Sequence, residues 1–298
     1  KLKKFTLITI MFSSVLLIGA ISFVLLMFYA NDVEKLVQNY PYFDEKTKSY
    51  QFTSVRPKSW ISIDSIAKEV QWAIIVSEDW AFFEHEGLDL EQIKIAATES
   101  IKQEKFVRGA STITQQIIKN TILTSKKSLW RKFQEAILSY KIEQFLSKDK
   151  ILEIYLNIIE LGEDLYGVGP ASFHYFGKHP SKLTAREGAF LAMLLPSPVK
   201  YSVSFKKKEL TPFARGIVDS ILIKMRQAKV YSKLDWLKNR KKFFSWEIIS
   251  PEYRDSIYTV EKKYREENKL LLNSPEINKE NRINESSDEE YLEYNVYE

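Results

Sequence analysis

The feature that most constrains this chain is an uncharged apolar run near its start. Residues Leu7–Ala30 read LITIMFSSVLLIGAISFVLLMFYA, and Lys1, Lys3 and Lys4 precede them. As a helix this run would extend roughly 36 Å, which exceeds the ~30 Å hydrocarbon core of a bilayer. The leading lysines favour a cytoplasmic N-terminus. We therefore expect a cytoplasmic stub over residues 1–6, a single-pass transmembrane anchor over residues 7–30, and the rest of the chain outside the cytoplasm.

A cleaved signal peptide is the alternative interpretation of the same run. The run is longer than the apolar region of a usual signal peptide. No small-x-small cleavage pattern follows it, since position 28 is Phe and position 30 is Ala. These two observations favour an anchor that is retained.

Composition divides the remaining chain into three parts. Residues 31–58 are polar and aromatic without clear periodicity, which indicates a connector, and residues 59–250 hold the apolar patterns of a folded domain. Residues 251–298 form a polar tail, whose part from Arg265 onward has ten acidic and four basic residues. Such a composition is typical of disorder. The chain has no cysteine, which excludes disulfides, thiolate metal sites and cysteine nucleophiles.

The folded domain has helical periodicity in most of its apolar segments and few runs that alternate at period two. Asp89 is positioned to cap a helix that reaches about Gln103. The other expected helices are one through Ile66, Val70, Ala73 and Ile74 with Ser62, Asp64 or Ser65 as its cap, Lys148–Leu161 stopped by Gly162, Leu183–Leu195 closed by Pro196 and Pro198, and Arg215–Met225. The sequence thus predicts a mainly α-helical domain.

The stretch Arg108–Asn120, RGASTITQQIIKN, has the strongest local signal for a binding site. Thr112 and Gln115 have the spacing of a capping box, which predicts a helix start near Ser111 or Thr112. A helix N-terminus favours anions, and the glutamines and Lys119 add polar groups beside it. An ordinary capped surface helix is the alternative for this stretch taken alone.

Carboxylates are the strongest catalytic candidates. Glu78 and Asp79 lie at an expected helix end among Trp80, Phe82 and Phe83. An apolar setting raises the pKa of a carboxyl group, which makes a Glu a usable base near neutral pH. Glu135 follows Arg131 by four residues, so an ordinary ion pair on a helix is its structural alternative. The three histidines lack zinc-site spacing, and we expect His85 to brace a loop.

Six sequence blocks, in order, carry a resemblance to a known family. They are EDWAFFEHEG at 78–87, RGASTITQQIIKN at 108–120, RKFQE at 131–135, KILEIYLNIIELG at 150–162, LYGVGPASFHYFGK at 165–178 and LTAREGAFLAMLLPSPVKY at 183–201. The stretch from about residue 60 to residue 225 resembles the peptidoglycan glycosyltransferases (the family-51 glycosyltransferase domain) in their monofunctional form.

The resemblance implies a helical domain with a lysozyme-like lobe and a smaller lobe against the membrane. It implies that lipid II is polymerised on the outer side of a bacterial cytoplasmic membrane, with the growing glycan strand and membrane lipid as partners. Glu78 would be the general base and Glu135 the second catalytic carboxylate. The substrate-binding residues would be Asp79, Arg108, Ser111, Gln115, Gln116, Lys119, Lys127, Arg131 and Lys132.

Two positions depart from the pattern of that family. Lys127 stands where an Arg is common, which removes a planar fork for phosphate oxygens. Gly169 and Pro170 replace a Glu-Ala type of pair, and Pro170 would influence where a helix starts. Neither change removes a carboxylate.

Cofactors and further partners are less constrained. No cofactor is required by the sequence, and a divalent cation, Mg²⁺ or Mn²⁺, at the pyrophosphate is left open. Lys206–Lys208, and Lys238–Lys242 beside Phe243 and Phe244, suit either a solvated basic face or membrane contact. Other wall-synthesis proteins remain open as partners, whereas nucleic acid is not expected outside the cytoplasm.

Two rival functions need separate consideration. A lytic enzyme that cleaves the same polymer would use a pair of carboxylates and would need no cation cluster, because its leaving group carries no pyrophosphate. The cations between Arg108 and Lys132 therefore argue against it. An inactive membrane-anchored scaffold would tolerate the loss of Glu78 or Lys119, and both are present.

Overall fold

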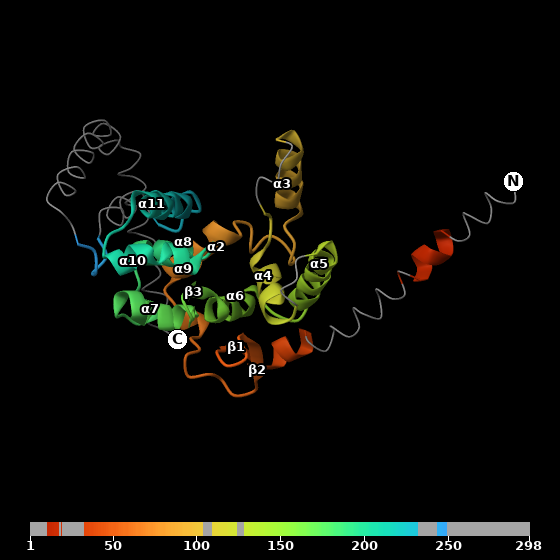
Figure 1. Cartoon of the computed structure of the whole chain (residues 1–298), viewed down its shortest axis with the longest axis horizontal. Coiled ribbons are helices and arrows are strands. Elements are labelled where there is room, and N and C mark those ends of the chain that lie inside the picture. Colours follow the sequence, from red (N-terminus) through yellow and green to blue (C-terminus); the bar gives the residue numbers. More distant parts are fainter. Residues whose placement is uncertain are drawn as a thin grey trace, which may run out of the picture.

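The protein is mainly α-helical, as expected, in a computed structural model that describes residues 11–17, 19, 33–103, 109–123, 128–231 and 243–248 (Figure 1). The longer helices are α2 (Lys68–Glu78), α3 (Leu90–Lys102), α4 (Ile113–Thr121), α5 (Leu129–Glu143), α6 (Lys148–Ile158), α7 (Val168–Phe176), α8 (Ala185–Leu194) and α11 (Pro212–Gln227). The short ones are α9 (Pro198–Tyr201), α10 (Val203–Lys207) and the 3₁₀ turns η1 (Ile63–Ser65) and η2 (Pro180–Lys182). Residues 11–17 and 33–38 are also helical.

Helix α8 forms the centre of the core, and all of its residues are buried. It begins with a capping box in which Thr184 and Glu187 satisfy each other's backbone N–H groups. Helices α2 and α11 pack against it. The contact with α2 is close, because a Cβ on Gly188 would lie 2.9 Å from the Cα of Val70. Glycine is therefore needed at this helix crossing.

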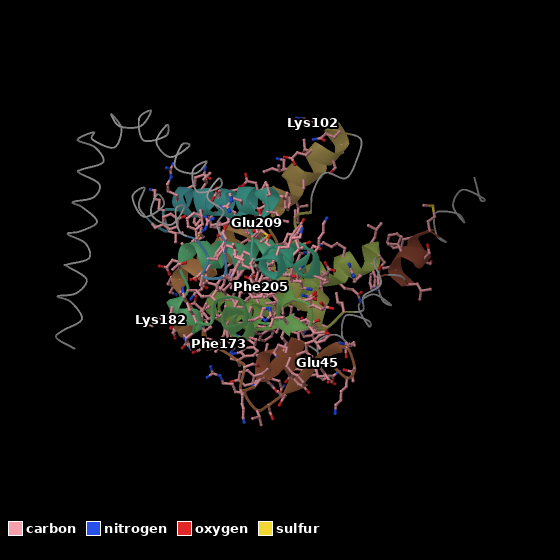
Figure 2. All side chains as sticks on the ribbon, turned by 60° about the vertical axis from the view of Figure 1, so that its left-hand side comes forward. Glu45, Lys102, Phe173, Lys182, Phe205 and Glu209 are labelled. Carbon is pink, nitrogen blue, oxygen red and sulfur yellow. The ribbon has the colours of Figure 1, made fainter. Side chains whose placement is uncertain are left out.

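Helices α4, α5 and α6 form a second group of helices, which α4 holds together. Helix α4 packs against both α5 and α6. Helix α3 buries only Ala96 and stands away from the rest, with Lys102 at its far end (Figures 1 and 2). Asp89 caps α3 by accepting a hydrogen bond from the backbone of Gln92, as the sequence predicted.

A β-hairpin lies within the segment that we expected to be a plain connector. Strands β1 (Tyr40–Asp44) and β2 (Ser49–Thr53) pair antiparallel. The Tyr50 hydroxyl donates to the carbonyl oxygen of Ile158 at 2.6 Å, which ties the hairpin to the end of α6. The hairpin therefore belongs to the folded domain, and interpreting 31–58 as a connector missed it. Of its strands, YPYFD does not alternate strictly between apolar and polar residues, and SYQFT alternates over only five residues, so the period-two signal is confined to one short strand.

The first domain helix begins later than predicted. Helix α2 starts after Ala67, which makes no side-chain cap, and the candidate caps Ser62, Asp64 and Ser65 precede the helix in or beside η1. The Gln71 side chain, one turn inside the helix, donates to the carbonyl oxygens of Ile63 and Ile66. A buried amide within the helix thus stabilises this entry turn.

The predicted helix from Lys148 is shorter than expected at its far end. It ends at Ile158, because Ile159 takes an extended backbone conformation. Gly162 therefore lies in strand β3 (Glu160–Gly162), which pairs with β4 (Leu165–Tyr166), and does not stop the helix. Similarly, Pro198 begins α9, whereas α8 already ends at Leu194.

The described residues beyond α11 contribute to the core. Phe244 is buried against Phe176 and Phe190. Glu247 forms an ion pair with Arg215 of α11 at 2.7 Å. Phe244 is thus not available for the membrane contact that its basic and aromatic setting suggested. Residues Lys238–Lys242 and the tail from residue 251 lie outside the described residues.

The expected transmembrane anchor lies mostly outside the described residues. Within the described ranges, residues 11–17 are helical, and no helix has both the length and the apolar character needed to cross a bilayer.

Candidate active site

Asp79, directly after α2, fixes the position of the next site helix. One of its carboxylate oxygens accepts a hydrogen bond from the backbone N–H of Ile113 at 2.9 Å, and the other lies 2.9 Å from His85 Nε2. Ile113 is the first residue of α4, where a negative charge is favourable. The Asp79 side chain is 2% exposed, and its hydrogen bond to Ile113 joins the end of α2 to the start of α4.

The predicted capping box provides a second set of hydrogen bonds at the start of α4. The Thr112 hydroxyl accepts from the Gln115 backbone N–H, and the Gln115 side-chain oxygen accepts from the Thr112 backbone N–H. The same hydroxyl donates to the carbonyl oxygen of Gly87 at 2.7 Å. Gly87 has a φ of +84°, and a Cβ there would lie 2.7 Å from the backbone of Ser139. Only glycine fits this loop, which is therefore fixed between α4 and α5.

Glu78, the last residue of α2, is half-buried beside the exposed face of α4. Its carboxylate accepts a hydrogen bond from Gln116 Nε2 at 2.9 Å, and Gln116 Oε1 accepts one from the Tyr155 hydroxyl at 3.0 Å. Burial raises the pKa of Glu78, while the Gln116 bond and the charges of Lys119 and Lys224 act in the opposite direction. A carboxylate with a raised pKa can accept a proton from a hydroxyl group in this position.

A second buried carboxylate, Glu135 of α5, organises two cations. Arg131 Nε lies 3.1 Å from one oxygen, and Lys132 Nζ lies 2.8 Å from the other. Lys132 also donates to the Ser111 hydroxyl at 2.9 Å, which joins α5 to the segment before α4. The Glu135 side chain is 3% exposed, so its carboxylate contacts these two cations and has almost no contact with bulk solvent.

Lys119, near the end of α4, connects the two carboxylates electrostatically. Lys119 is solvent-exposed, but partial desolvation by the surrounding site lowers its pKa. The charge of Glu135 raises this pKa, the charges of Arg131 and Lys132 lower it, and the charge of Glu78 raises it. Lys119 is thus within electrostatic reach of Glu78 and of the Glu135 group. We call Lys119, Arg131 and Lys132 the basic cluster. It offers three positive charges beside one candidate base, an arrangement suited to a phosphorylated ligand.

Comparison with known proteins identifies the family of this chain. A sequence profile described as Transglycosylase matches residues 45–225, which is more than half of the chain. The chain belongs to the transglycosylase family.

Individual proteins are also similar to this transglycosylase over about half of its length. A biosynthetic peptidoglycan transglycosylase of Nitrosomonas eutropha is 40% identical over 162 residues, which cover 54% of this chain and 66% of the relative. A protein of the same name from Nitrosospira multiformis is 38% identical over 171 residues, covering 57% and 73%. Penicillin-binding protein 1A of Aquifex aeolicus is 42% identical over 160 residues, covering 54% of this chain and 22% of that protein. The chain thus matches about two thirds of the transglycosylases and a small part of the larger protein.

Most of the predicted site residues of the transglycosylase lie in one connected network. The members that the structure joins by hydrogen bonds, ion pairs or electrostatic interactions are Glu78, Ser111, Gln116, Lys119, Arg131, Lys132 and Glu135. Asp79 and Gln115 were expected to bind substrate, but both are buried and engaged by the backbone around α4. In the structure both side chains fix the start of α4, and their contact with substrate stays a prediction. Arg108 and Lys127 lie outside the described residues.

Sequence reasoning missed two groups near Glu78. Tyr155 is fully buried on α6 and reaches the site through Gln116, and Lys224 acts on Glu78 from α11. The signal for Tyr155 was a phenol on the apolar face of a helix, since a buried hydroxyl needs a partner. The expectation that His85 braces a loop is confirmed by its contact with Asp79.

Two further expectations concern metals and the Gly169-Pro170 pair. Among the residues that the structure describes, no three His, Asp or Glu side chains are grouped as a metal site. A divalent cation at the pyrophosphate therefore stays a prediction. Pro170 is the third residue of α7, where a helix needs no backbone donor, so α7 starts normally at Val168. A Cβ on Gly169 would lie 2.8 Å from the Ile61 side chain, so glycine permits a close contact there.

Proposed function

We propose that this transglycosylase polymerises lipid II, a disaccharide-peptide carried on undecaprenyl pyrophosphate, into β-1,4-linked glycan strands. The observation that carries the proposal is the pairing of a half-buried Glu78, whose pKa burial raises, with the basic cluster. A base is needed to activate a sugar hydroxyl, and cations are needed where pyrophosphate departs. The names of the relatives, biosynthetic peptidoglycan transglycosylases, support the same substrate class.

The reaction assigns a distinct task to each carboxylate. Glu78 takes the proton from the 4-hydroxyl of the acceptor's N-acetylglucosamine. The hydroxyl oxygen forms a bond to the anomeric carbon of the growing strand with inversion, and the bond from that carbon to the pyrophosphate oxygen breaks. The electron pair leaves with undecaprenyl pyrophosphate, whose negative charge the basic cluster stabilises. Glu135 orients Arg131 and Lys132 for this purpose, as their ion pairs support.

The surroundings of the basic cluster fit an amphiphilic substrate. Leu129, Trp130 and Phe133 are exposed on the same end of α5 that carries Arg131 and Lys132, with Leu129 92% exposed. Helix α3, which stands away from the core (Figure 1), also exposes apolar side chains, among them Leu90 and Ile101. Apolar side chains beside cations suit an anionic membrane surface and a polyprenyl pyrophosphate within it.

We further propose that the domain has two lobes, of which one faces the membrane with this surface. Helices α2, α6, α8 and α11 would form a lysozyme-like lobe, and α3–α5 a smaller lobe against the outer face of a bacterial cytoplasmic membrane. Residues 7–30 would anchor the chain in the same membrane. The lipid-linked substrate and the site would then occupy one surface, which supports the assignment of membrane lipid as a partner.

The membrane contact predicts a specific effect on binding to vesicles. Replacing Trp130 and Phe133 with Ser should lower the fraction of protein that floats with vesicles containing anionic lipid by several-fold, in a form that lacks residues 1–30. Each large apolar side chain contributes about 1.5–3 kcal/mol when buried. Exchange of the exposed Phe173 on α7 for Ser is the matched control and should leave flotation unchanged. Equal flotation of all three proteins would contradict a membrane-facing α5.

The function itself is tested with the substrate. Detergent-solubilised full-length protein is incubated with fluorescently labelled lipid II, and the products are sized by gel electrophoresis. We expect glycan strands many disaccharides long, with release of undecaprenyl pyrophosphate. Unchanged lipid II under conditions in which an active transglycosylase consumes it would contradict the proposal and favour the scaffold interpretation.

A further inference from the structure

We propose that Tyr155 is a positioning residue for the general base, because its hydroxyl holds the Gln116 amide with the NH₂ group towards Glu78. The inference rests on the proposed function for the role of Glu78 and extends it to a residue on another helix. Tyr155 would touch neither substrate nor reacting atoms, and would act through Gln116.

The geometry supports a chain of two hydrogen bonds. The Tyr155 side chain is 0% exposed, and its hydroxyl donates to Gln116 Oε1 at 3.0 Å. Gln116 Nε2, the other end of the same amide, donates to Glu78 Oε2 at 2.9 Å. The three residues come from α6, α4 and α2, so the chain also joins three helices of the site.

The orientation of an amide depends on its neighbours, because its two ends have nearly the same shape and opposite hydrogen-bonding character. In the opposite orientation Gln116 would direct its carbonyl oxygen at the Glu78 carboxylate, which is repulsive. A tyrosine hydroxyl that donates to Oε1 favours the orientation in which Nε2 faces Glu78. Burial is the largest cause that raises the pKa of Tyr155, so the phenol stays protonated and remains a donor at neutral pH.

Other charged groups face Glu78 from the surrounding helices. Lys119 of α4 and Lys224 of α11 lower its pKa, and Asp79 beside it raises the pKa, whereas the Gln116 amide supplies a hydrogen bond. Burial makes the carboxylate form of Glu78 unfavourable, and the hydrogen bond from the Gln116 amide is the largest of the three effects that oppose burial. A residue that orients this amide therefore sets how far the base remains ionised at neutral pH.

Exchange of Tyr155 for Phe isolates the hydroxyl and keeps the ring in the core. In Tyr155→Phe we expect the acid limb of the kcat/KM profile for lipid II to move up by about 0.5–1 pH unit, the scale of a weakened bond to a charged group. At pH values well above this limb, the rate should lie within about threefold of the wild type. The ¹³C chemical shift of the Glu78 side-chain carboxyl, assigned with Glu78→Gln, should titrate with the same upward displacement.

A matched control separates positioning from general stability. Tyr175 is also buried, and its hydroxyl donates to the Leu161 carbonyl oxygen at 2.7 Å, away from Gln116. Tyr175→Phe should lose a comparable hydrogen bond and show an undisplaced pH profile and an unchanged Glu78 titration. If both variants lower the rate equally at every pH, Tyr155 is only structural and the inference fails.

A double-mutant cycle tests the route through Gln116. In the Gln116→Ala background, Tyr155→Phe should cause no additional displacement of the Glu78 titration, because the group through which it acts is absent. An equal displacement in both backgrounds would show that Tyr155 acts on Glu78 directly, which overturns the inference. The carboxyl titration does not require turnover, so this result stands apart from the lipid II assay that tests the proposed function.

Discussion

Glu78→Gln is expected to lower the turnover of lipid II by about 10²-fold or more while the fold is retained, which is the usual scale of general acid–base catalysis. Glutamine has the shape of glutamate, and its side-chain oxygen can still accept the bond from Gln116 Nε2. It cannot take up the proton of the acceptor hydroxyl at neutral pH. The initial rate of consumption of fluorescent lipid II measures the effect.

The same variant should unfold at a higher temperature than the wild type at neutral pH. Burial raises the pKa of Glu78 in the folded protein above the ordinary value of 4.5. At pH values below the unfolded-state pKa, Glu78 is protonated in both the folded and the unfolded state, so its ionisation does not change the free energy of unfolding. As the pH rises through that value and past the raised folded pKa, ionisation favours the unfolded chain, so stability is lost. Glutamine avoids this loss, and the gain in melting temperature should disappear near pH 4.

Glu84→Gln provides the control for both measurements. Glu84 lies in the loop after α2 and is exposed. Its exchange should leave turnover and melting temperature close to those of the wild type. An unchanged rate in Glu78→Gln would remove Glu78 from the mechanism. A lower melting temperature at neutral pH would show that the interactions of the carboxylate outweigh its burial.

The parts of the site that sequence reasoning predicted well are those fixed by local spacing. Thr112 and Gln115 are three residues apart, so their capping box and the start of α4 follow from the sequence alone. The ion pair of Arg131 and Glu135 follows in the same way from an i,i+4 spacing. Such contacts depend on one helix turn and need no knowledge of the tertiary fold.

The parts that were missed depend on contacts between distant segments. Tyr155 and Gln116 are 39 positions apart, and Tyr50 and Ile158 are 108 positions apart. No helical or strand period indicates which segments become neighbours. The contacts that Asp79 makes were not foreseen for a similar reason. It adjoins Glu78 in the sequence, yet the chain leaves the helix there and directs Asp79 to the backbone of α4.

Lys119→Ala is expected to lower turnover by about 10²-fold or more with little change in folding. Negative charge on the departing pyrophosphate grows towards the transition state, so a cation that faces it stabilises the transition state more than the bound substrate. Removing one preorganised donor typically costs about 2.7–4 kcal/mol in the barrier. Lys119 is exposed at the end of α4, so its side chain adds little to stability.

The loss should appear mainly in kcat rather than in KM, because the interaction strengthens as the pyrophosphate leaves. Exposed Lys182 in η2 is the matched control, and Lys182→Ala should keep the wild-type kcat. An equal loss in both variants would point to a general effect of net charge on binding to detergent or lipid. A loss confined to KM would assign Lys119 to ground-state binding.

The same pair of proteins separates synthesis from cleavage when each is given both lipid II and finished glycan strands. A lytic enzyme would cut finished strands. Lys119→Ala would change the rate of this hydrolysis little, because the leaving group of the hydrolysis is a neutral sugar hydroxyl. The proposed transferase should lengthen glycan from lipid II, lose this activity in Lys119→Ala, and leave finished strands intact. Short fragments released from finished strands by either protein would contradict the synthetic function. Cleavage of finished glycan releases no pyrophosphate, so the basic cluster would have no leaving group of that kind to stabilise.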